Sequence, residues 1–375
     1  PVVNHAGQVA FKAELAGTSG DFADDELVLR WEVGGLVGVF REGDELPDES
    51  GLYGTIFEEI GMSEEGRVLM RCLVTGASGG RTAGVFLSDV GDGDPVELAR
   101  KGDDLDGPEL NEFLSAQISD TGGVALLASF VRPTGRGIFA IEPGSPLEPV
   151  AVTMEPTPGE NGVFSAFRGS PSLSPLGAIG FSANLSGTSG GFDDDVGLFL
   201  GGAGSPVVEI TREGEPSGGN GSFGSELGEP TLNANGQMAF FTRFMAGTTG
   251  GAGDNIALYR ADNASTTFVE IARKGSPPPD GNGFFSDFRN PALNDPGQLA
   301  FVADLFATSG SFNDNRGIYF APGGPLPILL RVARRGQLTP NATRTFTDFE
   351  DPAINLKGQV AFLATDSSGA DGIYL

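Results

Sequence analysis

Aspartate recurs in a loop of this chain that is rich in Gly, Ser and Asp or Asn and occurs four times. Carboxylates, Asn carbonyls and backbone oxygens suit Ca²⁺, which takes about six to eight oxygen ligands at about 2.3–2.6 Å. Asp and Asn also initiate turns ahead of a strand, and no copy has the D-x-[DN]-x-[DN]-G pattern of an EF-hand. The sequence therefore leaves a calcium site and a simple turn as two open interpretations. The candidate ligands are Asp21, Asp24, Asp25, Asp193, Asp194, Asp195, Asp254 and Asp314.

Two G-x-S-x-G sequences, at residues 76–80 and 187–191, resemble the nucleophile motif of hydrolases. That chemistry needs a strand-to-helix elbow and a histidine base. The chain shows no helical periodicity, and its one histidine, His5, falls in a turn where we expect it to be solvated. We therefore predict flexible loops here. No H-E-x-x-H sequence, cysteine cluster or phosphate-binding glycine loop is found.

A short motif, N-x-x-G followed by an apolar strand that ends in Ala-Phe, organises the chain. Asn294-Asp295-Pro296-Gly297 is one copy, followed by a strand with Ala300 and Phe301. The copies recur every 55 to 61 residues, which indicates a repeat architecture. Asn or Ser opens each turn and Gly closes it, as a tight hairpin with positive φ requires. The closing glycines are Gly7, Gly66, Gly122, Gly177, Gly236, Gly297 and Gly358.

Each repeat supplies about four strands in order. In the sixth, the apolar run at 291–293, the strand at 298–304, the strand at 317–320 and the strand at 328–334 follow one another. Four-stranded units at this spacing are typical of β-propeller blades. We therefore predict an all-β, seven-bladed β-propeller of antiparallel blades that forms a single domain over residues 1–375. Its last blade is incomplete, because the chain stops in a third strand.

An arginine two residues before a glycine ends the fourth strand of five repeats. A ring of such arginines would bind an anion. The favoured interpretation is a bridge to a carboxylate or carbonyl of a neighbouring blade, made by the rigid donor fork. The arginines are Arg41, Arg100, Arg212, Arg273 and Arg334. Phenylalanines of the crossovers between blades are predicted to pack in the core; they include Phe164, Phe167, Phe285, Phe288, Phe346 and Phe349.

The net charge is −27, from 50 acidic and 23 basic residues. Nucleic acid and anionic lipid are poor partners for such a surface, whereas cations, cationic polymers and neutral polysaccharide fit it. Solubility in a salty exterior is the simpler explanation of the charge. No stretch of eighteen apolar residues is found, so no membrane insertion is expected. The single cysteine, Cys72, excludes an intrachain disulfide and is predicted to be a small core residue.

The turn-strand motif resembles the tandem NxxGxxAF repeats of bacterial surface proteins of the choice-of-anchor type. It is also similar to the repeat of TolB-type propellers, in which a Pro-x-Trp-Ser-Pro-Asp-Gly hairpin leads into an Ala-Phe strand. Residues 291–297, Pro-Ala-Leu-Asn-Asp-Pro-Gly, fill that place, without the tryptophan. The resemblance implies a propeller outside or on the surface of a bacterial cell, and it implies no reaction.

Two functions compete. The first is a non-catalytic extracellular or cell-surface module, which binds a surface component, polysaccharide or protein ligand through an acidic, loop-rich face. The alternative is a polysaccharide-processing enzyme, a glycosidase or lyase, with paired carboxylates on that face. We favour binding, because the acids recur from copy to copy whereas a catalytic site breaks the symmetry of the repeats. We also expect the chain to be part of a longer product with further domains.

Overall fold

The computed structural model describes residues 2–4, 6–90, 93–105, 107–262, 267–324 and 328–375, so His5 lies outside the described residues. These residues form seven antiparallel sheets and five short 3-10 helices. The fold is an all-β, seven-bladed β-propeller with four-stranded blades, as the repeats predict. None of the helices in the described residues is long and apolar enough to cross a membrane.

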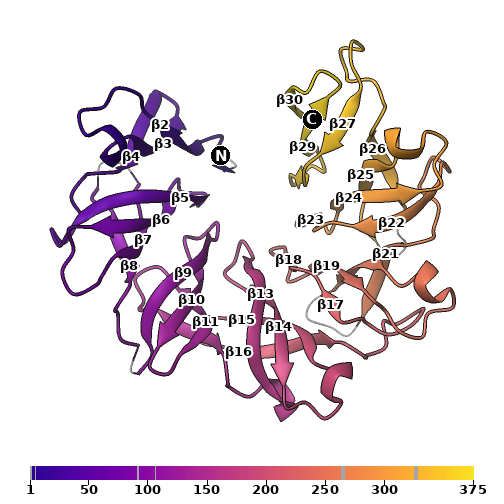
Figure 1. Cartoon of the computed structure of the whole chain (residues 1–375), viewed down its shortest axis with the longest axis horizontal. Helices are drawn as coiled ribbons and strands as arrows, with labels where there is room; N and C mark the ends of the chain where they lie inside the picture. The colour runs from indigo at the N-terminus through magenta and orange to yellow at the C-terminus, as the bar shows by residue number, and fades with distance from the viewer. Residues whose placement is uncertain (1, 5, 91–92, 106, 263–266, 325–327) are drawn as a thin grey trace. The chain divides into compact units, whose positions relative to one another are not determined.

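Contacts divide the chain into two compact units. Unit 1 comprises Pro1–Glu155, Pro175–Ile179 and Gly201–Val207, and unit 2 comprises Pro156–Ser174, Gly180–Leu200 and Val208–Leu375. Blades one to three fall in unit 1, and most of blade four and all of blades five to seven fall in unit 2 (Figure 1). The single-domain organisation over residues 1–375 stays a prediction.

In unit 1, blade one consists of β1 (Val2–Val3), β2 (Val9–Glu14), β3 (Glu26–Glu32) and β4 (Gly35–Arg41), with η1 (Asp21–Ala23) between β2 and β3. Blade two consists of β5 (Leu52–Met62), β6 (Val68–Thr75), β7 (Ala83–Leu87) and β8 (Val96–Arg100). Blade three consists of β9 (Glu109–Ile118), β10 (Val124–Val131), β11 (Gly135–Ile141) and β12 (Glu148–Val152).

In unit 2, η2 (Pro158–Glu160) precedes blade four, which consists of β13 (Val163–Leu173), β14 (Ile179–Ser186), η3 (Gly191–Asp193), β15 (Val196–Gly202) and β16 (Ser205–Arg212). Blade five consists of β17 (Glu226–Leu227), β18 (Thr231–Leu232), β19 (Met238–Arg243), η4 (Gly251–Gly253), β20 (Ala257–Ala261) and β21 (Phe268–Arg273). Blade six consists of β22 (Phe284–Phe288), β23 (Ala292–Leu293), β24 (Leu299–Phe306), η5 (Ser311–Asn313), β25 (Arg316–Ala321) and β26 (Leu330–Arg334). Blade seven consists of β27 (Phe346–Phe349), β28 (Ala353–Ile354), β29 (Val360–Asp366) and β30 (Asp371–Tyr374).

The N-x-x-G turn also ties one blade to the next. The Asn294 side-chain oxygen accepts the backbone N–H of Gln298 at 2.9 Å, which pins its own turn. Its amide nitrogen donates to the backbone oxygen of Asn355 at 2.7 Å, in the corresponding turn of blade seven. Gly297 closes the turn with φ of +78°, a conformation that favours glycine. The first position of the motif, Asn294 in blade six, therefore stabilises both its own hairpin and the contact with the next blade.

The first strand is longer than the sequence suggested. In blades five, six and seven it is broken into two pieces that both pair with the second strand. The phenylalanines assigned to the crossovers lie on this strand instead, on β13, β22 and β27. Their predicted burial is confirmed, because all six are at most 6% exposed. The prediction included only the short apolar run directly before each turn and missed the part of the strand that precedes it.

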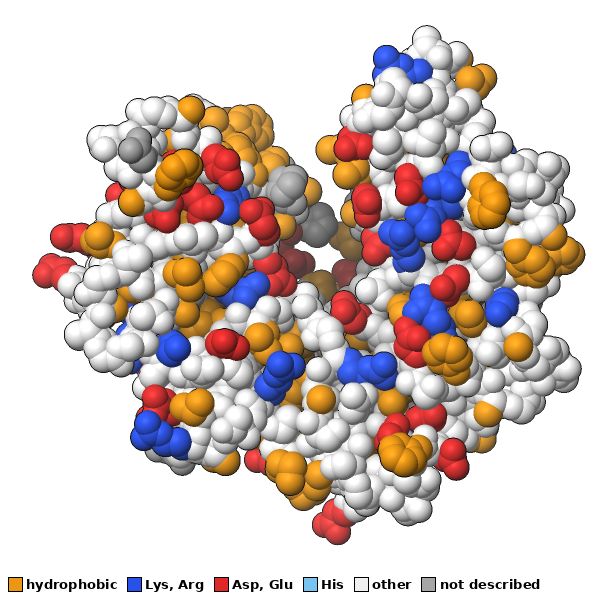
Figure 2. Space-filling model, viewed as in Figure 1, with side chains coloured by type: hydrophobic (Ala, Val, Ile, Leu, Met, Phe, Trp, Pro, Cys, Tyr) orange, Lys and Arg blue, Asp and Glu red, His pale blue; other side chains and the backbone are white. Residues whose placement is uncertain are grey.

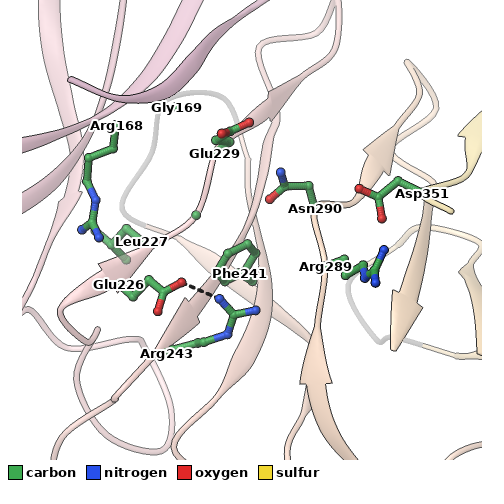
Figure 3. A pocket seen from close by; sticks show the side chains of 11 residues that line it. Arg168, Gly169, Glu226, Leu227, Glu229, Phe241, Arg243, Arg289, Asn290 and Asp351 are labelled. Carbon is green, nitrogen blue, oxygen red and sulfur yellow. Dashed lines mark hydrogen bonds and ion pairs between the residues drawn. The ribbon is translucent and has the colours of Figure 1, made fainter. Parts of the chain in front are cut away.

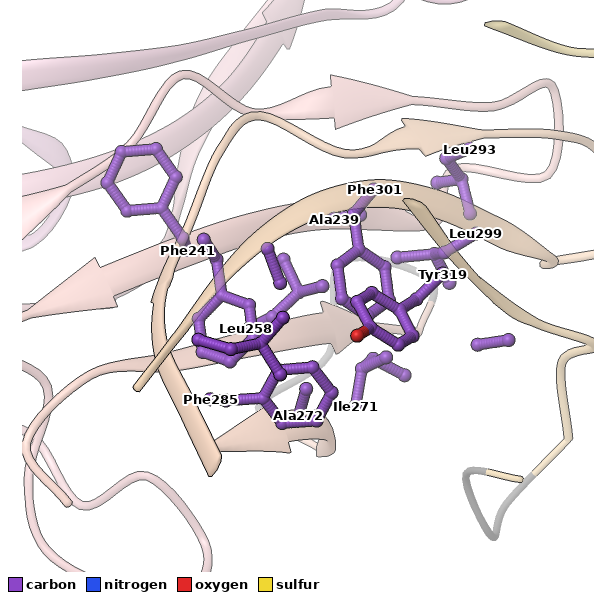
Figure 4. Packing of buried hydrophobic residues seen from close by; sticks show 14 residues of the cluster. Ala239, Phe241, Leu258, Ile271, Ala272, Phe285, Leu293, Leu299, Phe301 and Tyr319 are labelled. Carbon is purple, nitrogen blue, oxygen red and sulfur yellow. The ribbon is translucent and has the colours of Figure 1, made fainter. Parts of the chain in front are cut away.

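The second strand carries the core of blade six. Phe301 on β24 is fully buried and stacks on Tyr319 of β25, with ring centroids 5.9 Å apart. Figure 4 shows these rings packed with Phe285 of β22 and with Leu258 and Ile271 of blade five. The Ala-Phe pair therefore alternates across the strand, so that its phenylalanine faces an inter-blade layer. Cys72 is also buried, as predicted, and burial raises the pKa of its thiol to about 12.

Blade seven has three strand positions, because β30 pairs only with β29 among the described residues. β25 holds the same position in blade six but lies between β24 and β26. We expect the amides of β30 to exchange with solvent faster than those of β25, since an edge strand leaves N–H groups without ladder partners. Hydrogen exchange followed by mass spectrometry measures this. Equal protection of the two strands would contradict the expectation.

Candidate functional site

Four aspartates close the loop between the second and third strands of their blades. Each directly follows one of the 3-10 helices η1, η3, η4 and η5. Its carboxylate accepts the N–H of the glycine four residues earlier, at 2.9–3.1 Å. In three of the blades an asparagine from the crossover donates a second hydrogen bond, as Asn220 does to Asp254 at 2.7 Å. The four residues are Asp24, Asp194, Asp254 and Asp314.

These hydrogen bonds also control ionisation. The Thr248 hydroxyl is the main cause that lowers the pKa of Asp254 to about 2. The Thr18 hydroxyl likewise lowers the pKa of Asp24. For Asp194 and Asp314 burial opposes the shift, but threonine and asparagine donors outweigh it and the pKa of each is lowered. The four carboxylates are ionised and already bonded to donors, which is how an aspartate stabilises a turn.

The other candidate ligands have different surroundings. Asp193 lies in η3 and Asp21 in η1, although the side chain of Asp21 is outside the described part of the structure. Asp25 and Asp195 directly precede β3 and β15. No three His, Cys, Asp or Glu side chains in the described residues are grouped closely enough to hold a metal ion. Calcium binding by the eight aspartates stays a prediction.

The arginine that ends the fourth strand joins parts of its own blade. Arg334 donates to the backbone oxygens of Asp314 and Asn282, both at 2.7 Å, and to the Asp280 carboxylate at 2.8 and 2.9 Å. It thus links the aspartate loop to the crossover that leads into blade six. The predicted bridge to a neighbouring blade is wrong here, because the end of strand four lies beside its own blade's loop. Arg260 of β20 makes such a bridge instead, to the Gly297 oxygen at 2.7 Å.

A cavity of about 340 Å³ lies against the first strands of blades four to seven, entirely within unit 2 (Figure 3). These strands are neighbours, since β13 contacts β18, β18 contacts β23 and β23 contacts β28. In blades five to seven the strand breaks at a proline, which has no N–H for the ladder. The residues before these prolines, Glu229, Asn290 and Asp351, line the cavity.

One glycine makes room for the Glu229 carboxylate. Gly169 of β13 has φ of +62°, and a Cβ there would lie 2.0 Å from Glu229 Oε1. Any larger residue would clash with the carboxylate and would also strain the backbone. Blades four and five therefore meet closely enough for the two strands to share one wall of the cavity.

Arg243 forms a fixed part of the wall. Its guanidinium pairs with Glu226, bonds Asp287 at 2.8 Å and the Phe288 oxygen at 2.9 Å, and lies 4.2 Å from the centre of the Phe241 ring. Burial lowers the pKa of Arg243, but the two carboxylates outweigh that effect and raise it. The side chain is therefore held charged and in one place.

Arg168 and Arg289 are held more loosely. Arg168 donates to the Ser225 oxygen at 3.1 Å, and Arg289 lies 3.9 Å from Glu350. A guanidinium has five N–H donors, which is more than these contacts use. Both side chains line the cavity, and in Figure 3 they lie on opposite sides of it. They can therefore donate hydrogen bonds to a ligand.

Two further groups give the cavity its chemistry. The Asn290 side-chain oxygen is buried and has no hydrogen-bond partner in the described residues. A buried acceptor without a donor is costly, and a ligand hydroxyl or a water would satisfy it. Burial raises the pKa of Asp351, and Arg289 only partly offsets this. The ionisable lining residues balance, with Arg168, Arg243 and Arg289 against Glu226, Glu229 and Asp351.

The sequence contains a pattern that points to this cavity. The proline of the first strand recurs at Pro230, Pro291 and Pro352, whereas the residue before it changes from Glu to Asn to Asp. A position that varies inside an otherwise repeated motif marks the place where blades differ in chemistry. The proximity of this position to Arg168 and Arg243 could not be foreseen, because Arg168 lies on β13 of blade four and Arg243 on β19, the second strand of blade five.

Phenylalanine at the middle of three aspartate loops is also unexpected. Phe22, Phe192 and Phe312 are 90%, 91% and 82% exposed, and they occupy equivalent places in blades one, four and six. Single exposed apolar side chains are normal on protein surfaces. These three phenylalanines are therefore no part of the core that the crossover phenylalanines build.

Similar solved structures include TolB from Acinetobacter baumannii, with 13% identity, a TM-score of 0.39 and coverage of 88% of this chain and 64% of that one. A PL25 ulvan lyase has 13% identity and a TM-score of 0.41, and the match covers 100% of this chain and 90% of that one. The periplasmic gluconolactonase PpgL of Pseudomonas aeruginosa has 13% identity and a TM-score of 0.40, and the match covers 98% of this chain and 94% of that one. The chain thus spans slightly less than two thirds of the TolB structure. No curated protein matches.

A family model covers almost all of the chain, from residue 3 to residue 373, and its description is "Family of unknown function (DUF7453)". The match contains all seven N-x-x-G turns and every residue of the cavity between Arg168 and Asp351. With this extent of agreement, the chain belongs to the DUF7453 family.

Proposed function

We propose that this protein is a non-catalytic binding module, and that the cavity on the first strands of unit 2 binds a neutral polysaccharide. The unpartnered oxygen of Asn290 carries the proposal, because a saccharide hydroxyl in the cavity would supply the donor that it lacks in the described residues. Saccharide hydroxyls both donate and accept. Arg168 and Arg289 would donate to them, and Asp351 would accept.

The charge of the cavity selects among polysaccharides. Its three arginines balance its three carboxylates, so neither a polycation nor a polyanion gains a net attraction there. The face in Figure 2 likewise carries acidic and basic side chains intermixed. The whole chain has a charge of −27 and repels anionic polymers at long range. A neutral glycan is not repelled by the net charge and needs no charged partner in the cavity. We propose that the protein meets it outside a bacterial cell.

Binding is tested by isothermal titration calorimetry with neutral oligosaccharides, with uronate-containing and sulfated ones for comparison. We expect Asn290→Ala or Arg168→Ala to weaken binding by about 10-fold or more, the effect of losing one strong hydrogen bond. Arg132→Ala is the control, since that side chain is 81% exposed and lies in unit 1. Affinity should change little with salt. Binding restricted to anionic or cationic polymers, or unaffected by both cavity variants, would refute the proposal.

A polysaccharide-processing enzyme is the second candidate, and the raised pKa of Asp351 favours it. A raised pKa favours the protonated form of a carboxyl group, which is the form that a general acid requires. In that case the wild type would release new reducing or unsaturated ends from a glycan, and Asp351→Asn would abolish release while binding persisted. If the wild type binds the glycan but releases no product, the result favours the non-catalytic module over the enzyme.

A further inference from the structure

The residue after the strand-ending arginine faces the last residue of the aspartate loop. In blade four these are Glu213 and Asp195, and in blade five Lys274 and Asn255. Their backbones occupy equivalent places. The backbone N–H of Glu213 donates to the Val196 oxygen at 2.8 Å, and that of Lys274 donates to the Ile256 oxygen at 2.9 Å. The corresponding pair is Glu42 with Asp25 in blade one and Arg335 with Asn315 in blade six.

The pairs fall into two chemical kinds. In blade six the Arg335 guanidinium donates to the Asn315 side-chain oxygen at 2.9 Å, so a cation and a neutral acceptor meet. Blade five also has a cation and an amide at these positions, Lys274 and Asn255, although the Asn255 side-chain oxygen has no hydrogen-bond partner in the described residues. In blades one and four both members are carboxyl groups, and no cationic side chain stands at that position. The same backbone thus holds a positive charge in two blades and only acids in two others.

Each acid pair contains one buried carboxylate oxygen that has no donor among the described residues. Glu42 is 7% exposed, and its Oε2 has no hydrogen-bond partner in the described residues. Oε2 of Glu213 is equally buried and unpartnered. The nearest lysine in blade one, Lys12, is already paired with Glu26 at 2.8 Å. Burying a carboxylate beside another carboxylate is expensive unless a cation or a proton compensates for the charge.

From this geometry we infer that blades one and four each bind a small divalent cation between the two carboxyl groups, Asp25 with Glu42 and Asp195 with Glu213, where blades five and six have a lysine and an arginine. The inference retains only Asp25 and Asp195 of the eight candidate calcium ligands. The turn-closing Asp24 and Asp194 are excluded, because their oxygens are taken by backbone and side-chain donors.

The Glu213 member of the blade-four pair borders a cavity. A cavity of about 550 Å³ is lined by Glu213 together with Asp193 and Asp194, wholly within unit 2. Burial and the neighbouring Asp195 raise the pKa of Glu213 to about 7. Arg212 also lines this cavity, but its guanidinium is bonded to Glu209 and to the backbone oxygens of Asn161 and Asp194. Two carboxyl groups leave the remaining ligands to water and backbone oxygens. Such a site suits Ca²⁺ at about 10⁻⁴–10⁻³ M, the range of extracellular modules.

Calorimetry with Ca²⁺ on the whole chain tests the inference, with Mg²⁺ as the comparison ion. We expect about two Ca²⁺ per chain, and a melting temperature about 2 °C or more higher in millimolar Ca²⁺ than in EDTA. The double variant Asp195→Asn with Glu213→Lys copies the blade-five pair, so it should bind one Ca²⁺ and melt higher in EDTA than the wild type. Adding Asp25→Asn and Glu42→Lys should abolish binding.

Glu65→Gln is the matched control, because that carboxylate is 66% exposed and belongs to neither pair. It should leave two Ca²⁺ per chain. If the lysine variants fail to fold by circular dichroism, the isosteric Glu213→Gln should still reduce the stoichiometry to one. The inference is overturned if wild type binds no Ca²⁺, or if its stoichiometry is the same in the folded pair variants. A wild type that ignores Ca²⁺ but is stabilised by Glu213→Gln would show that a shared proton occupies the pair instead.

Discussion

Phe301→Ala should lower the free energy of unfolding by about 3–5 kcal/mol, the usual cost of removing a buried aromatic ring. Phe301 is fully buried on β24 and packs against Phe288 and Tyr319, with ring centroids 5.9 Å away in both cases. Its loss removes apolar burial and also leaves a cavity that the rigid sheets cannot close. Urea titration followed by circular dichroism gives the difference in unfolding free energy.

Phe312→Ala is the matched control for this measurement. The same side chain is removed in the same blade, but Phe312 is 82% exposed in η5. We expect a change below about 0.5 kcal/mol, as is usual for surface substitutions. A loss under about 1 kcal/mol for Phe301→Ala would mean that β24 is out of register by one residue. The paired Cα atoms of Phe301 and Tyr319 define the register at stake.

The fold could be predicted because its determinants are local and repeated. An N-x-x-G turn, an alternating strand and an Ala-Phe pair need only neighbouring residues, and seven copies average out their differences. The first strands were predicted too short for a physical reason. A proline such as Pro291 breaks the ladder and divides the strand, so that β22 looked like part of the crossover.

The sites were harder to predict, because they depend on contacts between distant residues. Aspartates such as Asp254 resemble metal ligands in the sequence, but Oδ2 of Asp254 accepts a hydrogen bond from Asn220, which is 34 positions away. The acid pair of Asp195 with Glu213 joins a loop to the end of a later strand. The cavity combines residues from four blades. Sequence reasoning finds what repeats, whereas these features arise where the repeats differ.

Arg334→Ala should destabilise the protein by about 2–4 kcal/mol, somewhat less than the cost of breaking a fully buried ion pair because the Asp280 side chain is 20% exposed. The Arg334 side chain itself is only 4% exposed. Its removal leaves the Asp280 carboxylate without its bidentate partner, and the Asp314 and Asn282 oxygens without a donor. Without the Arg334 hydrogen bonds, the aspartate loop and the crossover that leads into blade six would separate. Urea titration at pH 7 measures the loss.

Arg331→Ala provides the control, because Arg331 contacts the same carboxylate at 2.6 Å but is 40% exposed. An exposed pair contributes less than about 1 kcal/mol. Similar losses for both variants would show that the backbone oxygens bound by Arg334 contribute nothing.

The difference between wild type and Arg334→Ala should also depend on pH. Burial raises the pKa of Asp280, but hydrogen bonds from Arg334 and Arg331 outweigh it and hold the pKa below the ordinary 3.8. A group with a lowered folded-state pKa contributes stability that is present above its unfolded pKa and is lost as the pH falls through the folded value. The difference should therefore be constant from pH 7 to about pH 5 and shrink below about pH 4. It should not vanish there, because Arg334 still donates to two backbone oxygens. A difference that grew on acidification would contradict the assignment of Asp280 as the partner.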